Sequence, residues 1–182
     1  MNNQFLTLVR HAKSSWKTDG QKDHDRVLST RGERDAPIMA NRLLERQCIP
    51  NLILCSSAAR TIQTAEVFLN VLGISADALR VDRCLYLCSP KTLLEQLASV
   101  EEGHEHIMII GHNPGLEQLS TLLSPLCNPE MPTLGIRHFT CPSFDHIPLR
   151  KLYQSEKRKP EAIAEQTVEL IFEDFPKNDQ SR

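Results

Sequence analysis

An arginine and a histidine stand side by side at Arg10 and His11, directly after the apolar segment 5–9. That segment predicts a buried strand, so both residues lie at its carboxyl end, where open α/β sheets bind their ligands. A guanidinium donates paired hydrogen bonds to phosphate oxygens, and a neutral imidazole offers a nucleophilic nitrogen. The pair therefore indicates a phosphoryl ligand. A solvated basic pair is the alternative, because phosphate sites need several converging donors.

A second arginine follows a second strand of the same plan. The segment 50–57 predicts a short buried strand that ends in small polar residues, and Ser57 is a suitable N-cap for a helix over 58–72 that Gly73 ends. Arg60 then lies in the first turn of that helix. A cation there opposes the helix dipole, so an anion between the two is expected.

A third strand, predicted over 105–110, runs into the sequence Gly-His-Asn-Pro-Gly and places His112 at its tip. Pro114 opens the next helix, which continues to about Leu123. Three strand ends therefore supply candidate phosphate ligands: Arg10, His11, Arg60 and His112. Ser56, Ser57 and Asn113 can donate further hydrogen bonds near a phosphate, although capping and turn duties also explain them.

The remaining segments complete an α/β pattern. Helices are expected from Ser29 or Thr30 to near Arg46, with Pro37 in a first turn, and over 89–97 with Ser89 as cap. Strands are expected over 78–81, 131–140 and, as an edge strand, 167–173. The polar segment 13–26 predicts a loop that can carry site residues. The alternation of strands and helices predicts a three-layer α/β/α domain with a mostly parallel sheet and helices on both faces.

Length and composition favour one domain over 1–182, with its core at about 4–140 and an extension or edge strand in 141–182. A net charge of -2 gives no electrostatic reason to expect nucleic acid or a membrane as partner. No apolar run approaches the roughly 18 residues of a membrane span, and a cytoplasmic location is expected. The six cysteines are dispersed, which predicts structural thiols in a reducing compartment. His104 and His106 flank a glutamate ahead of a strand, and surface exposure is expected for both.

Several motifs resemble those of the histidine phosphatase superfamily, the group that includes phosphoglycerate mutase. They occur in the family's order: Leu-Val-Arg-His-Ala-Lys-Ser-Ser-Trp, Asp-His-Asp-Arg-Val-Leu-Ser-Thr-Arg-Gly, Cys-Ser-Ser-Ala-Ala-Arg-Thr with Thr-Ala-Glu, Ile-Gly-His-Asn-Pro-Gly, and Met-Pro-Thr-Leu-Gly. The chain is most similar to the short bacterial phosphohistidine phosphatases. The resemblance runs from about residue 4 to residue 140, and more loosely to the end. It implies a phosphoglycerate mutase-like fold.

The resemblance also implies a role for each motif residue. His11 becomes the nucleophile that forms a phosphohistidine enzyme intermediate. Arg10, Arg60 and His112 would hold the three equatorial oxygens, and Arg26 would add a phosphate contact from the loop. No metal and no cofactor is expected, because the guanidiniums and the second imidazole neutralise the oxygen charge. Such a cationic pocket also opposes protonation of the nucleophile.

The chain departs from the wider superfamily where many members supply a glutamate as general acid. The corresponding segment, 82–86, reads Asp-Arg-Cys-Leu-Tyr. Asp82, Asp19 or Asp23 could serve instead. Without an acid, phosphoester hydrolysis is slow because an alkoxide leaves poorly, whereas the imidazole of a phosphoramidate leaves far more readily. A chain this short also leaves little room for a lid, and an open pocket admits a side chain of another protein.

These observations predict a metal-independent hydrolase that removes phosphate from phosphohistidine on a partner protein. A phosphotransfer domain of signal transduction or a phosphocarrier protein is the expected partner at the level of the family. Two alternatives stay open. The first is a phosphomonoesterase for a small metabolite that uses one of the loop acids, and the second is a catalytically silent phosphate-binding scaffold.

Overall fold

Six strands form one sheet in the order β3-β2-β4-β1-β5-β6 in a computed structural model that describes residues 4–16, 20–141 and 168–176. β1, β2, β3 and β4 run parallel, whereas β5 is antiparallel to both β1 and β6. The strands are β1 (Gln4–Arg10), β2 (Leu52–Ser56), β3 (Leu79–Asp82), β4 (His106–Gly111), β5 (Ile136–Cys141) and β6 (Glu169–Asp174).

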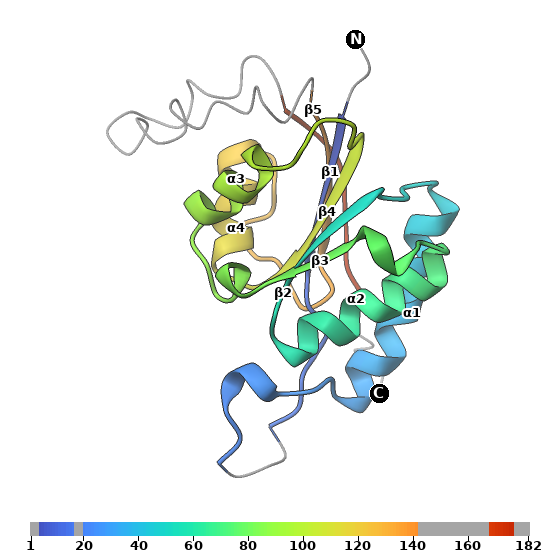
Figure 1. Cartoon of the computed structure of the whole chain (residues 1–182), viewed down its shortest axis with the longest axis vertical. Coiled ribbons are helices and arrows are strands. Elements are labelled where there is room, and N and C mark those ends of the chain that lie inside the picture. The colour runs from blue at the N-terminus through green and yellow to red at the C-terminus, as the bar shows by residue number, and fades with distance from the viewer. Residues whose placement is uncertain (1–3, 17–19, 142–167, 177–182) are drawn as a thin grey trace.

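Helices cover both faces of this sheet, α1 and α2 on one side and α3 and α4 on the other (Figure 1). Their bounds are α1 (Thr30–Glu45), α2 (Ala59–Leu72), α3 (Pro90–Ala98) and α4 (Gly115–Leu123), with 3-10 turns η1 (Asp23–Asp25), η2 (Ala76–Ala78) and η3 (Arg83–Leu85). The predicted three-layer, mostly parallel α/β/α fold is confirmed. None of the described helices has the length and apolar character needed to cross a membrane.

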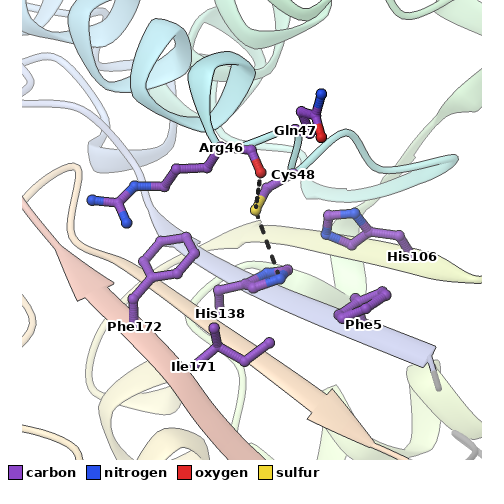
Figure 2. A pocket seen from close by; sticks show the side chains of 8 residues that line it. All are labelled: Phe5, Arg46, Gln47, Cys48, His106, His138, Ile171 and Phe172. Atoms are coloured by element: carbon purple, nitrogen blue, oxygen red, sulfur yellow. Dashed lines mark hydrogen bonds between the residues drawn. The ribbon is translucent and has the colours of Figure 1, made fainter.

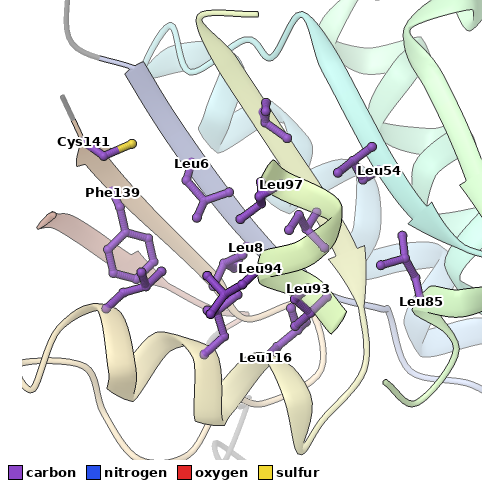
Figure 3. Close-up of a cluster of buried hydrophobic side chains, with 14 of the residues drawn as sticks. Leu6, Leu8, Leu54, Leu85, Leu93, Leu94, Leu97, Leu116, Phe139 and Cys141 are labelled. Atoms are coloured by element: carbon purple, nitrogen blue, oxygen red, sulfur yellow. The ribbon is translucent and has the colours of Figure 1, made fainter. Parts of the chain in front are cut away.

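Alternation along the central strands builds two hydrophobic layers. Leu6 and Leu8 of β1 point into the cluster beneath α3 and α4 (Figure 3), and Val9 points into the cluster beneath α1 and α2. All six residues of β4 are buried, because this strand has neighbours on both edges and helices on both faces. The packed layers fix the strand ends, and with them the backbone from which the candidate site residues project.

Most helix boundaries agree with those predicted from the sequence. Ser29 caps α1 by accepting a hydrogen bond from the Gly32 amide, Ser89 caps α3, and Gly73 ends α2 with a φ of 66°. The prediction for Pro37 was wrong, because α1 continues through it. Buried apolar side chains on both sides of the proline hold the helix against the sheet, and this packing outweighs the lost backbone hydrogen bond.

Two further predictions need correction. Ser57 is not the N-cap of α2, since the cap is Ala58, which makes no side-chain capping bond. The strand expected from residue 131 begins only at Ile136, because the Gly135 amide bonds to the Pro132 carbonyl oxygen in a turn before it.

The C-terminal edge strand is confirmed as β6. Residues 142–167 of the expected extension lie outside the described residues.

His106 was expected to be exposed but is only 7% exposed, at the end of the sheet opposite the predicted site. The Thr7 hydroxyl lies 2.7 Å from His106 Nε2 and 2.8 Å from His138 Nδ1. Each of the two buried imidazoles therefore has a hydrogen-bond partner within the protein. Burial lowers the pKa of each imidazole to about 4. Both line a cavity of about 520 Å³, where Cys48 approaches His138 (Figure 2).

The start of α4 depends on Gly115. A Cβ atom at this position would clash with the backbone carbonyl oxygen of Cys88, whereas a Cβ at Gly111 would meet nothing closer than 3.7 Å. We expect Gly115→Ala to lower the free energy of unfolding by about 1–3 kcal/mol, because the backbone must shift. Gly111→Ala should change it by less than about 1 kcal/mol. Urea denaturation of both variants checks this, and equal midpoints would contradict it.

Candidate active site

The four side chains predicted from three separate strand ends meet at the carboxyl edge of the sheet. Arg10 ends β1, His11 follows it, Arg60 lies in the first turn of α2, and His112 follows β4. Arg60 contacts both imidazoles, with its Nε 3.3 Å from His11 Nε2 and its Nη2 3.3 Å from His112 Nδ1. The centres of the two imidazole rings lie 5.1 Å apart. The parallel order of β2, β4 and β1 produces this convergence.

The hydrogen bonds of His11 fix its tautomer. Its Nδ1 lies 2.8 Å from the Ala12 carbonyl oxygen, which can only accept, so Nδ1 carries the hydrogen. Nε2 is left with a lone pair that faces Arg60. Burial, aided by the charges of Arg60, Arg10 and Arg26, lowers the pKa of His11 to about 4. The imidazole is therefore neutral at pH 7 and has a nucleophilic nitrogen close to three guanidiniums.

His112 has a second polar partner in Ser56, a fully buried residue at the end of β2. Ser56 Oγ lies 2.8 Å from His112 Nε2, and Arg60 donates to Nδ1, so Nε2 carries the hydrogen in the free protein. Burial, together with nearby His11 and Arg60, lowers the pKa of His112 to about 3. Because a hydroxyl both donates and accepts, Ser56 can also support the tautomer whose Nδ1–H donates to a phosphate oxygen.

Arg10 retains an unused donor. Its Nη1 donates to the Met131 carbonyl oxygen at 2.7 Å, but its buried Nε has no hydrogen-bond partner among the described residues. A buried donor without a partner costs about 1–3 kcal/mol. This cost is relieved if the donor meets an oxygen of a bound anion, so the free Nε supports an anion site here.

Asn113 and Ser57, the other two predicted ligands, make hydrogen bonds elsewhere. The Asn113 amide donates to Glu117 at 2.6 Å and to the Met131 carbonyl oxygen at 2.8 Å. Ser57 Oγ lies 2.9 Å from His24 Nε2. These contacts brace the loops around the pocket. A phosphate contact from either residue stays a prediction.

Arg26 is linked to the other site residues by its hydrogen bond to the carboxylate of Asp23. It donates to the Ser15 carbonyl oxygen, to Ser14 Oγ and, at 2.7 Å, to Asp23 Oδ1. Its guanidinium carbon lies 3.3 Å from the centre of the Trp16 ring, which is itself 71% exposed. Trp16 therefore packs against the loop by covering one face of Arg26.

Asp23 is the loop acid that contacts the pocket. Its Oδ2 accepts hydrogen bonds from Tyr86 Oη at 2.6 Å and from Arg60 Nη2 at 3.0 Å. Partial burial raises its pKa, but the hydrogen bonds from Tyr86 and Arg26 and the charge of Arg60 outweigh this and hold the pKa well below its usual range. Asp82 instead caps η3 by accepting from the Cys84 amide. Asp19 lies outside the described residues.

Sequence reasoning missed the contact of Ser56 with His112 and the place of Tyr86 in the site. The sequence leaves a phosphate contact and a turn role open for Ser56, and its position at the end of a buried strand is the available signal. Tyr86 lies in the segment that lacks the expected glutamate. Its hydrogen bond to Asp23 joins residues 63 positions apart, which no local pattern predicts.

A family model, the histidine phosphatase superfamily (branch 1), matches residues 6–83. An uncharacterised protein of Mycobacterium tuberculosis is 35% identical over 118 residues, which cover 65% of this chain and 71% of the relative. An uncharacterised chloroplastic protein of Arabidopsis thaliana is 32% identical over 131 residues, covering 65% and 58%.

Solved structures share this fold over most of the chain. A candidate phosphohistidine phosphatase, SixA, from Agrobacterium tumefaciens has a TM-score of 0.72 at 25% identity, covering 95% of this chain and 98% of that one. A second candidate SixA, from Nakamurella multipartitia, has a TM-score of 0.70 at 23% identity, covering 97% and 98%. A protein histidine phosphatase SixA solved with tungstate has a TM-score of 0.66 at 24% identity, covering 75% and 87%.

The lowered pKa of His11 predicts an unusual titration. We expect the imidazole of the free protein to stay neutral down to about pH 4, instead of taking up its proton near 6.5. In Arg60→Gln the midpoint should move toward neutral pH, because one positive neighbour is gone. NMR of the ring nitrogens, with the signal assigned by its loss in His11→Gln, measures both midpoints. A wild-type midpoint near 6.5 would contradict the burial of this group.

Proposed function

The chain belongs to the histidine phosphatase superfamily, and from that premise we propose that it is a phosphohistidine phosphatase. In this proposal His11 takes the phosphoryl group from a phosphohistidine side chain of a partner protein and passes it to water. The family and its solved phosphatases support a phosphatase-type hydrolase. The observation that carries the proposal of a phosphohistidine phosphatase is the lone pair of His11 Nε2, which lies among guanidiniums.

The reaction would proceed in two displacements. The Nε2 lone pair of His11 attacks phosphorus, the bond from phosphorus to the substrate imidazole breaks, and that imidazole leaves with a proton taken from solvent. Water then attacks the phosphorylated His11, the bond from phosphorus to Nε2 breaks, and orthophosphate departs. Arg10, Arg60 and His112 would bind the phosphoryl oxygens during both steps, because positioning and charge neutralisation dominate phosphoryl transfer. With these charges present, we propose that no metal is required.

The state of Asp23 favours an imidazole leaving group over an alkoxide. An alkoxide needs a protonated acid beside it, whereas the low pKa of Asp23 keeps this carboxyl ionised at neutral pH. Asp82 is engaged in capping η3. An imidazole is a far better leaving group and depends less on a protein acid. A phosphoramidate is therefore the substrate class that this set of residues supports best.

A phosphomonoesterase for a small metabolite remains the second candidate. It is favoured by one observation, the carboxylate of Asp23 in contact with Arg60. If a bound phosphoester displaced Asp23 from its donors, the carboxyl could take up a proton and serve as an acid. A silent phosphate-binding scaffold is a third reading, and His11 that is never labelled by phosphodonors would support it. The partner, its place in signal transduction and a cytoplasmic location belong to the proposal as well.

Phosphate release tests the proposed function. With chelator present, we expect the wild type to hydrolyse a phosphohistidine protein much faster than an alkyl phosphoester such as a sugar phosphate, whose alkoxide needs an acid to leave. His11→Ala should lose at least about 1000-fold of this activity, because the nucleophile is gone. Acid-labile labelling of His11 in a rapid quench would detect the intermediate. Faster release from the ester would replace the phosphohistidine proposal with the metabolite alternative.

Arg60 and Arg26 should contribute differently to catalysis. We expect Arg60→Ala to reduce kcat/KM for phosphohistidine by about 100-fold or more, since it removes donors at the reacting nitrogen. Arg26→Ala should reduce it less, because this guanidinium reaches the pocket through Asp23. Steady-state kinetics of the two variants make the comparison. An equal or larger loss in Arg26→Ala would mean that Arg26 binds the phosphoryl group directly.

A further inference from the structure

The free protein already contains an anion at the proposed phosphoryl pocket, and that anion is the carboxylate of Asp23. Oδ1 accepts from Arg26 Nη1 at 2.7 Å, and Oδ2 accepts from Arg60 Nη2 at 3.0 Å. The main-chain oxygen of Asp23 also accepts from Arg60 Nη1 at 2.6 Å. Arg60, which would bind the phosphoryl group, and Arg26 are therefore both engaged by this one residue.

The position of the carboxylate is fixed from outside the pocket. Tyr86 Oη donates to Oδ2 at 2.6 Å. The next residue, His24, lies 2.9 Å from Ser57 Oγ at the start of α2, and its ring packs edge-on against Tyr86. η1 therefore rests on the first turn of α2, beside Arg60. These contacts hold Asp23 in a set arrangement.

A phosphoryl group and this carboxylate need the same donors. Arg60 Nη2 is shared between Asp23 and His112, and Arg60 Nε already faces His11. A phosphate dianion beside an ionised carboxylate is repelled, and this repulsion is stronger in a partly buried site than in water. Asp23 must therefore release the guanidinium side chains when a phosphoryl group enters. Arg10 differs, because its Nε has no partner among the described residues.

We propose that Asp23 is a specificity-determining residue that competes with the phosphoryl group for Arg60. The competition lowers the affinity of the pocket for free orthophosphate, so the product leaves after each turnover. A phosphoryl group attached to a partner protein brings additional contacts, and these offset the competition. The inference rests on the proposed function in one respect, that the pocket at His11 receives a phosphoryl group.

The protein contains its own reporter for this competition. Trp16 is the single tryptophan of the chain, and its ring lies against the guanidinium of Arg26. Displacement of Asp23 changes the surroundings of that guanidinium, so the intrinsic fluorescence should respond to anion binding. Isothermal titration calorimetry measures the same dissociation constant without relying on the tryptophan.

The experiment measures orthophosphate binding to Asp23→Asn and to a matched control. Asp25→Asn removes the same charge from the same 3-10 turn, but the Asp25 side chain is 61% exposed, and its polar partner in the described part of the chain is His24 at 3.3 Å. We expect Asp23→Asn to bind orthophosphate about tenfold more tightly than the wild type, because a neutral amide competes less for a guanidinium. Asp25→Asn should stay within about twofold, and Asp23→Ala should change in the same direction as Asp23→Asn.

Two results would overturn the inference. Equal affinity in Asp23→Asn and the wild type would mean that the carboxylate does not compete. Weaker affinity in Asp23→Asn and Asp23→Ala, with circular dichroism unchanged, would mean that Asp23 orients the arginines for binding. The Asp23 side chain is 36% exposed, so its replacement should leave the fold intact. Failure of the proposed function appears separately, as a wild type that binds orthophosphate but releases none from phosphohistidine.

Discussion

The buried charge of Arg60 is the constraint on which the site depends. Its side chain is only 3% exposed, in the first turn of a helix, where the dipole disfavours a cation. A charge in this position requires compensation on every side. His11 and His112 accept its hydrogen bonds as neutral imidazoles, and Asp23 supplies the negative charge. The same cation that would bind phosphate therefore helps burial to keep the nucleophile neutral, and it holds a loop carboxylate beside it.

The sheet determines which residues can surround that cation. β4 lies between β1 and β2 and runs parallel to both, so their carboxyl ends bring His11, His112 and Arg60 together from distant parts of the chain. β5 reverses direction, and the turn before it supplies the Met131 carbonyl oxygen that positions Arg10. The layers of helices on both faces keep these strand ends fixed. The candidate site residues are thus concentrated at the carboxyl ends of the central strands.

The sequence predicted the parts of this arrangement that obey periodicity or local chemistry. Apolar strands followed by polar residues located His11 and His112, and Gly73 and Ser89 predicted helix boundaries. Features that depend on tertiary contacts were not predictable. Pro37 stays within a helix because of its packed neighbours, His106 is buried because Thr7 satisfies it, and Ser57 bonds to a loop instead of capping α2. When two side chains in contact are 30 or more residues apart in the sequence, no local sequence pattern indicates their contact.

Asp23 shows why the presence of an acid in a pocket does not by itself indicate acid catalysis. A carboxyl donates a proton only if its surroundings favour the neutral form, as in an apolar pocket. Here Tyr86, Arg26 and Arg60 all stabilise the anion. This carboxyl is therefore an anion in the free protein, and its surroundings assign it to the balance of charge. A leaving group that needs little help from a protein acid, such as imidazole, is the one compatible with that balance.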